Sequence, residues 1–344
     1  MKIKLFQFHP HTLFSNGGGE AMFKNVLSEL KNRNIDVSVF DIQSRNSEDF
    51  DLFHLFGSNN SVSEIYLPLS VANKKLVVSA IDYSNMSFVR LKLYKLFQKY
   101  YLFPNVYKYR QKLFSSAATV IANSYSEKKF LLNYFDLPQE KIIVIPVGVS
   151  SKFYKNKSDS FINKFSFNDY ILCVGRINSR KAQIKTIKAL SKLNIDLVFI
   201  GQSDPSEPDY FEEFQKIVKD TSHVHWIGQL AHDSDLLISA YSNALVHVLP
   251  SNPPEFPGIA SMEAGLAGTK IVTTDAPVLR ETFKNYAYYC NSEEESIYES
   301  VKKALDENIN EDLSRYLYEN FTWEKIISQY IDVYKVLGNT SGME

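Results

Sequence analysis

The chain has 344 residues, which suits two domains of ordinary size rather than one small core. Its 44% hydrophobic and 22% charged residues fall in the globular range, which excludes long disordered stretches, and two cysteines cannot form a disulfide framework. The net charge of -1 hides an asymmetry, because residues 1–150 hold 18 Lys and Arg against 12 Asp and Glu, whereas the remainder holds 20 against 27. The opening residues lack the apolar stretch of a signal peptide and no window is apolar enough to span a bilayer, so we expect a cytoplasmic protein.

The first half of the chain alternates short apolar runs with helical stretches, as buried parallel strands do in βαβ units. The predicted strands are "KIKLFQF", "IDVSVF", "FDLFHLF", "KLVVSAI", "ATVIANS" and "KIIVIPVGV". A glycine turn that includes Gly18 and Gly19 precedes the first helix, where backbone amides favour an anion. A dinucleotide fingerprint would need a further glycine where Met22 stands, although Asp41 ends the second strand where a ribose-binding acid would lie. A tight turn without a ligand is an equal alternative.

Residues 83–126 contain no Asp or Glu but seven basic and eleven aromatic residues. At about 100° per residue, Lys92, Lys95 and Lys99 fall on one side of a helix over residues 90–101, and large apolar side chains fall opposite. This is the pattern of a basic amphipathic helix on an anionic membrane surface. A domain helix with a core-facing apolar side and a solvated lysine side explains the pattern equally well.

The second half repeats the rhythm with "YILCVG", "IDLVFIG", "VHWIG", "ALVHVLP" and "KIVTTD". A polar stretch rich in Ser, Asn and Lys separates the two blocks and is predicted to be a linker. We therefore expect two doubly wound, Rossmann-like α/β domains, residues 1–155 and 168–320, followed by a helix at 321–338. Ligands in such folds bind beyond the carboxyl ends of the strands, so the cleft between the domains is the expected site.

The segment "VGRINSRKAQIKTIKAL" ends a strand at Gly175 and Arg176 and is expected to open a helix at Lys181. Two cations beside a strand end and a helix start suit a diphosphate. Taken alone this signal is weak, because basic residues at helix starts are usually solvated.

The segment "PPEFPGIASMEAGLAG" places Glu255 in a tight loop and Glu263 inside an apolar helix, where an unpaired carboxylate would be costly. The amides near Gly258, Ile259 and Ala260 can receive an anion, and the two carboxylates can accept hydrogen bonds from sugar hydroxyls. The alternative is structural, with Glu255 as a surface turn residue and Glu263 paired to a lysine.

Neither a metal nor another cofactor is expected. The Asp-x-Asp pairs at 49–51 and 233–235 stand before a strand and at a helix start, without a further carboxylate cluster. Zinc-site spacings and a Walker A string are absent, and no nucleic-acid partner is indicated.

Together these segments resemble the retaining glycosyltransferases of family 4 (glycosyl transferases group 1), which have the GT-B fold. "PEFPGIASMEAGLAGTKIVTTD" is similar to the family's Glu-x7-Glu segment. The glycine loop, "VIANSYSEKKFLLNYFDLPQEKIIVIPVGV", "VGRINSRK", "VHWIGQL" and the terminal "FTWEKIISQYIDVY" stand in the family's order, so the resemblance covers nearly the whole chain. It implies an acceptor-binding domain, a nucleotide-sugar-binding domain facing it across a cleft, and a last helix that packs back on the first domain.

The resemblance also implies residue roles. Glu263 would hold the ribose hydroxyls, Glu255 those of the transferred sugar, and Arg176 and Lys181 the diphosphate. The amides of Gly258, Ile259 and Ala260 and the loop of Gly18 and Gly19 would assist donor binding. Glu255, Arg176 and Lys181 would form the catalytic group, and Ile81 stands where many members carry a histidine.

The expected function is a metal-independent retaining transfer of a sugar to a lipid-linked or saccharide acceptor in bacterial surface polysaccharide synthesis, at the inner face of the membrane. Family habit favours a UDP-sugar and leaves GDP-mannose open. One alternative is a degenerate, non-catalytic scaffold of a glycan assembly complex, supported by Ile81. Another is a nicotinamide-dependent oxidoreductase, supported by the glycine loop and Asp41 but not by Met22.

Overall fold

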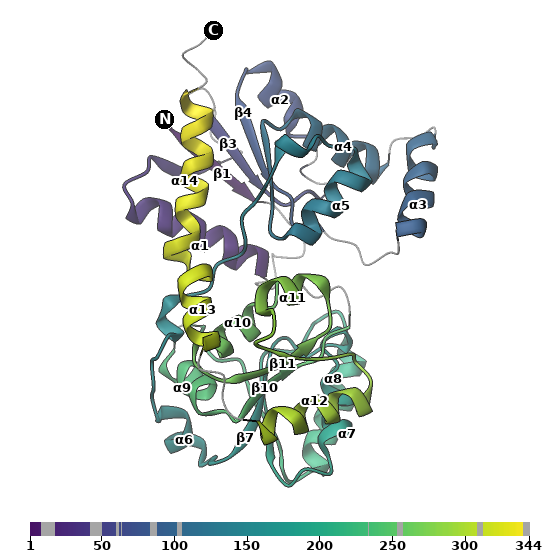
Figure 1. The fold of residues 1–344 in the computed structure, drawn as a ribbon, viewed down its shortest axis with the longest axis vertical. Coiled ribbons are helices and arrows are strands. Elements are labelled where there is room, and N and C mark those ends of the chain that lie inside the picture. The colour runs from purple at the N-terminus through teal and green to yellow at the C-terminus, as the bar shows by residue number, and fades with distance from the viewer. Residues whose placement is uncertain are drawn as a thin grey trace. The chain divides into compact units, whose positions relative to one another are not determined.

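The structure is a computed structural model that describes residues 1–7, 18–41, 50–59, 62, 64–82, 88–101, 105–232, 234–252, 257–307 and 312–339. The chain divides into two compact units (Figure 1). Unit 1 comprises Met1–Gly148 and Trp323–Glu344, and unit 2 comprises Val149–Thr322.

Unit 1 is built on a six-stranded parallel sheet in the order β2-β1-β3-β4-β5-β6. Its strands are β1 (Ile3–Gln7), β2 (Val37–Val39), β3 (Leu52–Phe56), β4 (Lys75–Ser79), β5 (Thr119–Ala122) and β6 (Ile142–Val144). Every residue of β3 and β5 is buried, because helices cover both faces of the sheet. The helices are α1 (Gly18–Asn32), α2 (Tyr66–Val71), α3 (Phe88–Tyr100), α4 (Val106–Ser116), α5 (Tyr125–Phe135) and α14 (Trp323–Asn339).

The carboxy-terminal helix α14 packs on unit 1, although the preceding chain belongs to unit 2. Its buried Tyr334 hydroxyl lies 2.6 Å from His54 Nδ1 on β3, and His54 Nε2 lies 2.9 Å from Ser79 Oγ on β4. At the start of α14 the Trp323 ring covers Gly148, where a Cβ would come within 2.4 Å of it. Glycine at position 148 therefore makes this packing possible.

Unit 2 holds a second six-stranded parallel sheet, in the order β12-β11-β10-β7-β8-β9. Its strands are β7 (Tyr170–Val174), β8 (Asp196–Ile200), β9 (Val224–Gly228), β10 (Val246–Leu249), β11 (Lys270–Thr274) and β12 (Tyr288–Cys290). One face is covered by α7 (Gln183–Leu190), α8 (Pro208–Asp220) and α12 (Glu294–Asp306). The other is covered by α6 (Ser160–Phe165), α9 (Asp235–Asn243), α10 (Ile259–Leu266), α11 (Pro277–Phe283) and α13 (Asp312–Phe321).

Residues 149–167 are part of unit 2 rather than the linker that their polar composition predicts. They contain a 3₁₀ turn, Ser151–Phe153, and the helix α6, whose Phe161 is fully buried. The Phe161 amide donates to Ser239 Oγ on α9 at 3.0 Å, and Val149 forms a bridge with Thr322. Phe161 and Phe167 are buried in the core and the half-buried Phe165 packs against it, and this burial outweighs the polar residues between them.

The two parallel sheets with helices on both faces confirm the predicted pair of doubly wound α/β halves. The strand order of unit 2 reverses between β7 and β10, which are neighbours in the sheet although two strands separate them in sequence. The carboxyl ends of strands on either side of such a reversal are where open α/β sheets bind ligands. The candidate site residues of unit 2 follow β7 and β10 directly.

Candidate functional site

The ends of β7 and β8 approach each other unusually closely. A Cβ at Gly201, which follows β8, would lie 2.0 Å from the carbonyl oxygen of Gly175, which follows β7. The Gly175 amide donates to Ile200 O at 2.9 Å, so the two backbones stay paired up to this point. Because only glycine at position 201 permits this approach, it fixes where Arg176 leaves the sheet.

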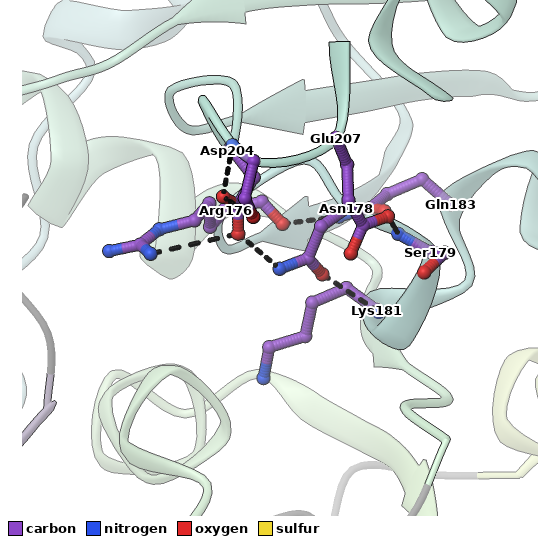
Figure 2. Close-up of polar contacts among 8 residues, drawn as sticks. Arg176, Asn178, Ser179, Lys181, Gln183, Asp204 and Glu207 are labelled. Atoms are coloured by element: carbon purple, nitrogen blue, oxygen red, sulfur yellow. Dashed lines mark hydrogen bonds and ion pairs between the residues drawn. The ribbon is translucent and has the colours of Figure 1, made fainter. Parts of the chain in front are cut away.

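Arg176 belongs to a polar cluster centred on Asp204 (Figure 2). Arg176 Nη1 lies 3.7 Å from Asp204 Oδ2, and Asn178 Nδ2 donates to the same oxygen at 3.0 Å. The other carboxylate oxygen accepts from the amide and hydroxyl of Ser206 at 3.1 and 2.7 Å. Partial burial opposes ionisation, but the hydrogen bonds from Asn178 and Ser206 and the Arg176 charge outweigh it and lower the pKa of Asp204 to about 2. Asp204 is therefore a fixed anion that holds Asn178 and Arg176.

Lys181 lies beside the same strand end. It closes a 3₁₀ turn, Ser179–Lys181, that Asn178 caps by accepting from the Lys181 amide at 3.1 Å. Ala182 then has φ +54, which separates this turn from α7, so the helix begins at Gln183 and not at Lys181 as predicted. Lys181 is 9% exposed, and a Cβ on Gly175 would lie 3.9 Å from its Cε. The structure thus brings the two predicted cations, Arg176 and Lys181, together at the end of β7.

The start of α10 has amides without a side-chain cap among the described residues. Gly258, its N-cap, has φ +77, and the structure assigns no side-chain cap hydrogen bond to this position. The left-handed conformation favours glycine, and a Cβ there would lie 2.7 Å from Leu279 Cδ2. Within the part of the chain that the structure describes, the buried hydroxyl of Ser261 finds no hydrogen-bond partner. A helix start with uncapped amides and an unsatisfied hydroxyl suits an anion with several oxygens.

Glu263 is a buried carboxylate held by two partners. It is 3% exposed, and its Oε1 lies 2.6 Å from His232 Nε2, where the imidazole N–H donates. Its Oε2 accepts from the Tyr241 hydroxyl at 2.9 Å. Burial and the neighbouring Glu263 raise the pKa of Tyr241, so its hydroxyl stays protonated as a donor. The structural alternative predicted a lysine as the partner of Glu263, and the partners recorded among the described residues are His232 and Tyr241. A carboxylate oxygen can accept more than one hydrogen bond, so each keeps capacity for a ligand hydroxyl.

Glu255, the other predicted carboxylate, lies outside the described residues. Four residues that the sequence analysis did not single out belong to the site: Asn178, Asp204, His232 and Tyr241. The sequence could have indicated Asn178, because Asn directly before a short helical turn is a common capping residue. It could not have indicated His232, because this residue comes from the loop after β9, 31 residues from Glu263.

The remaining predicted residues belong to unit 1. Gly18 and Gly19 are the first residues of α1, and a Cβ at Gly19 would lie 3.3 Å from Gln7 Nε2. Ile81, after β4, has φ +46, which is a strained conformation for a β-branched residue. The next residue, Asp82, accepts from Arg110 Nη1 at 2.9 Å.

The three predicted membrane lysines on α3 differ in their surroundings. Lys92 and Lys99 are exposed. Lys95 instead binds Asp136 on the neighbouring α5 side of unit 1, at 2.5 Å from Oδ1, and donates to Asn133 O at 2.8 Å. Lys95 therefore anchors α3 to unit 1.

No group of His, Cys, Asp and Glu side chains in the described ranges could hold a metal ion. None of the helices described has both the length and the apolar character needed to cross a bilayer.

Part of unit 2 is similar to a known protein family. Residues 155–321 match the family described as glycosyl transferases group 1. The chain is 29% identical over 237 residues to an uncharacterised glycosyltransferase of Methanocaldococcus jannaschii, and 28% identical over 213 residues to the O-antigen chain mannosyltransferase RfbU of Salmonella typhimurium. These matches cover 63% and 58% of this chain and only 60% and 56% of the two relatives.

Solved structures share the fold of both units. HepE of Anabaena in complex with UDP superposes with a TM-score of 0.78 at 16% identity, over 98% of this chain and 100% of that one. Sucrose-phosphate synthase from Thermosynechococcus elongatus gives a TM-score of 0.75 at 16% identity, over 99% of this chain and 100% of that one. These likenesses confirm the predicted GT-B fold.

Proposed function

We propose that the protein is a retaining glycosyltransferase that moves a sugar from a nucleoside diphosphate sugar to a lipid-linked or saccharide acceptor in bacterial surface polysaccharide synthesis. The observation that carries this proposal is the buried Glu263 carboxylate, held in place by His232 and Tyr241. It lies on α10, which follows β10, and β10 is the neighbour in the sheet of β7, the strand that Arg176 and Lys181 follow. One unit thus combines a hydroxyl acceptor with two cations and the amides of a helix start.

The ribose and the diphosphate of the donor each have a matching group in unit 2. The vicinal ribose hydroxyls would donate to Glu263, whose oxygens are fixed before the ligand arrives. The diphosphate would lie on the amides of Ile259 and Ala260 beside Gly258, with Arg176 and Lys181 neutralising its charge. Glu255 and the loop of Gly18 and Gly19 stay predictions for the transferred sugar and the diphosphate.

The proposed transfer needs no base supplied by the protein. The bond between the anomeric carbon and the diphosphate oxygen breaks, and the acceptor oxygen bonds to the same face of that carbon. The proton of the acceptor hydroxyl passes to the leaving diphosphate oxygen. Arg176, Lys181 and the start of α10 stabilise the charge that develops on the diphosphate. No metal has a part in this scheme.

A UDP-sugar is the favoured donor, and a GDP-sugar is the competitor. The solved structures of HepE hold UDP and UDP-glucose, whereas RfbU is named a mannosyltransferase. Both nucleotides therefore belong in the test.

Thermal melting with UDP, GDP and NAD tests the proposal. At a nucleotide concentration about 100 times the dissociation constant, binding stabilises the fold by about 2.7 kcal/mol. We expect UDP or GDP to raise the melting temperature of the wild type and of Glu299→Gln, an exposed change on α12 of the same unit. Glu263→Gln should lose the shift while its ligand-free melting still shows a folded protein. A shift with NAD alone would contradict the proposal and support an oxidoreductase.

The scaffold alternative rests on Ile81, whose strained backbone stands where related enzymes carry a histidine. It predicts no shift with any nucleotide. Two features argue against the scaffold alternative: the Glu263 carboxylate that His232 and Tyr241 hold in place, and the two cations after β7. A scaffold has no physical need for a buried carboxylate that can accept further hydrogen bonds.

A further inference from the structure

The apolar side of helix α3 is exposed to solvent. Leu93, Phe97 and Tyr100 are 63%, 63% and 71% exposed, and Val89 and Leu96 are exposed as well. We call these five residues the α3 apolar face. Contiguous apolar surface of this kind on a folded domain marks an interaction site.

The opposite side of α3 faces the protein. Leu91 is buried in the core of unit 1, and Lys95 binds Asp136 and Asn133 O. At about 100° per residue these two side chains lie about 40° apart on the helix, and the α3 apolar face lies on the far side. In Figure 1, α3 lies beyond α4 and α5, away from the sheet of unit 1. An amphipathic helix of a domain usually turns its apolar side to the core, and here most of that side faces solvent instead.

Basic residues border the α3 apolar face and no acidic residue lies near it in sequence. Stepping round the helix, exposed Lys92 stands at one margin of the face and exposed Arg90 at the other, with Lys99 near Lys92. From Tyr83 to Ser126 the chain has no Asp or Glu. An apolar strip with basic margins and tyrosines is the pattern of helices that lie in the interface of an anionic bilayer.

We propose that the α3 apolar face inserts into the headgroup–acyl boundary of an anionic lipid bilayer, with Lys92 and Lys99 at the headgroups. A second copy of this chain fits less well, because a symmetric contact through this face would bring the basic margins of two helices together. The inference rests on the proposed function in one respect: a lipid-linked acceptor is presented at such a surface.

Vesicle flotation of the full chain tests the inference without a donor or an acceptor. We expect the wild type to float with vesicles of phosphatidylcholine and phosphatidylglycerol, and much less with phosphatidylcholine alone. The double change Leu93→Ser and Phe97→Ser should abolish flotation. The double change Lys92→Glu and Lys99→Glu should weaken binding to the anionic vesicles by at least about 25-fold. Each lysine near the bilayer contributes about fivefold to the affinity, and the two contributions multiply.

Matched changes elsewhere serve as controls. Val71→Ser with Val336→Ser removes two exposed apolar residues from α2 and α14, and Lys157→Glu with Lys192→Glu makes the same charge change in unit 2. Both should float like the wild type. Nucleotide-induced melting shifts should be the same in all these variants, so a failure of the donor site is seen separately from a failure of α3.

Three results would overturn the inference. The wild type could fail to float with the anionic vesicles, or the α3 variants could float as well as the controls. Alternatively, light scattering could show a dimer that Leu93→Ser with Phe97→Ser converts to a monomer, with no vesicle binding in either form. That last result would assign the α3 apolar face to a second copy of the chain.

Discussion

Single residues set the geometry of the site in unit 2, and glycine shows this most plainly. Gly258 starts α10 with φ +77, in a space that leaves 2.7 Å between an added Cβ and Leu279 Cδ2. Gly201 lets two backbones meet at the end of β7 and β8. Both glycines place amides or cations where the proposed diphosphate binds, although neither has a side chain to contact it.

Gly258→Ala should destabilise unit 2 through both backbone strain and a clash. The clash with Leu279 costs about 1–3 kcal/mol and the left-handed φ up to about 1 kcal/mol. Gly268→Ala is the matched control, because Gly268 has φ +97 but nothing within 4 Å of an added Cβ. Urea unfolding should show a larger loss for Gly258→Ala. Equal losses would mean that Leu279 moves aside freely.

A comparison of Asn178→Ala with Asn105→Ala distinguishes an effect on donor binding from an effect on stability alone. Asn178 caps the turn that holds Lys181, and Asn105 caps α4 in unit 1 in the same way, each accepting from an amide at 3.1 Å. Losing either cap should cost about 1 kcal/mol in the free energy of unfolding. Titration calorimetry should show weaker nucleotide binding for Asn178→Ala and unchanged binding for Asn105→Ala. Equal affinity in both variants would place Lys181 outside the site.

Among the elements, α14 depends on a buried neutral histidine for its docking in unit 1. His54 is fully buried between the Tyr334 and Ser79 hydroxyls, and burial lowers its pKa to about 3. In the unfolded chain the imidazole of His54 becomes protonated as the pH falls below about 6.5, whereas in the folded unit it stays neutral down to about pH 3. This contribution to stability is therefore complete above pH 6.5 and is lost as the pH falls from 6.5 toward 3.

The free energy of unfolding of unit 1 should fall by up to about 1.4 kcal/mol per pH unit below pH 6.5 on account of His54. Burial raises the pKa of Glu127, in the same unit, to about 8, so protonation of Glu127 makes unit 1 more stable as the pH falls. The prediction therefore concerns the difference in unfolding free energy between the wild type and His54→Asn. Trp323, at the start of α14, reports on this unit once Trp226 in unit 2 is changed to Phe. Parallel pH profiles for the two proteins would contradict the account.

At the scale of the whole molecule, the fold could be predicted because its signals are local. Short runs rich in Val and Ile, separated by helical stretches, identify buried parallel strands without knowledge of their partners. The family match and the shared fold agree with that prediction. The segment 149–167 could not be assigned this way, because three buried phenylalanines stand among polar residues.

The site was predictable only in part because its supporting contacts are distant in sequence. Arg176, Lys181 and Glu263 follow strand ends or lie on the next helix, and this placed them in the expected site. The residues that hold them follow the ends of other strands, Asp204 after β8 and His232 after β9, so the local pattern does not show which residues they contact. The periodicity of α3 likewise shows two faces but not which one is exposed, because Asp136, 41 residues away, binds Lys95.

The measurement that tests the central claim most directly is the anomeric configuration of the transferred sugar. The protein is incubated with the sugar donor of the nucleotide that raises its melting temperature, and water serves as the acceptor. Proton NMR then records the released sugar before its anomers interconvert. We predict that the anomer first formed keeps the configuration of the donor, and that Glu263→Gln releases none at the same donor concentration. A first-formed product of inverted configuration, or equal release by both proteins, would contradict the account.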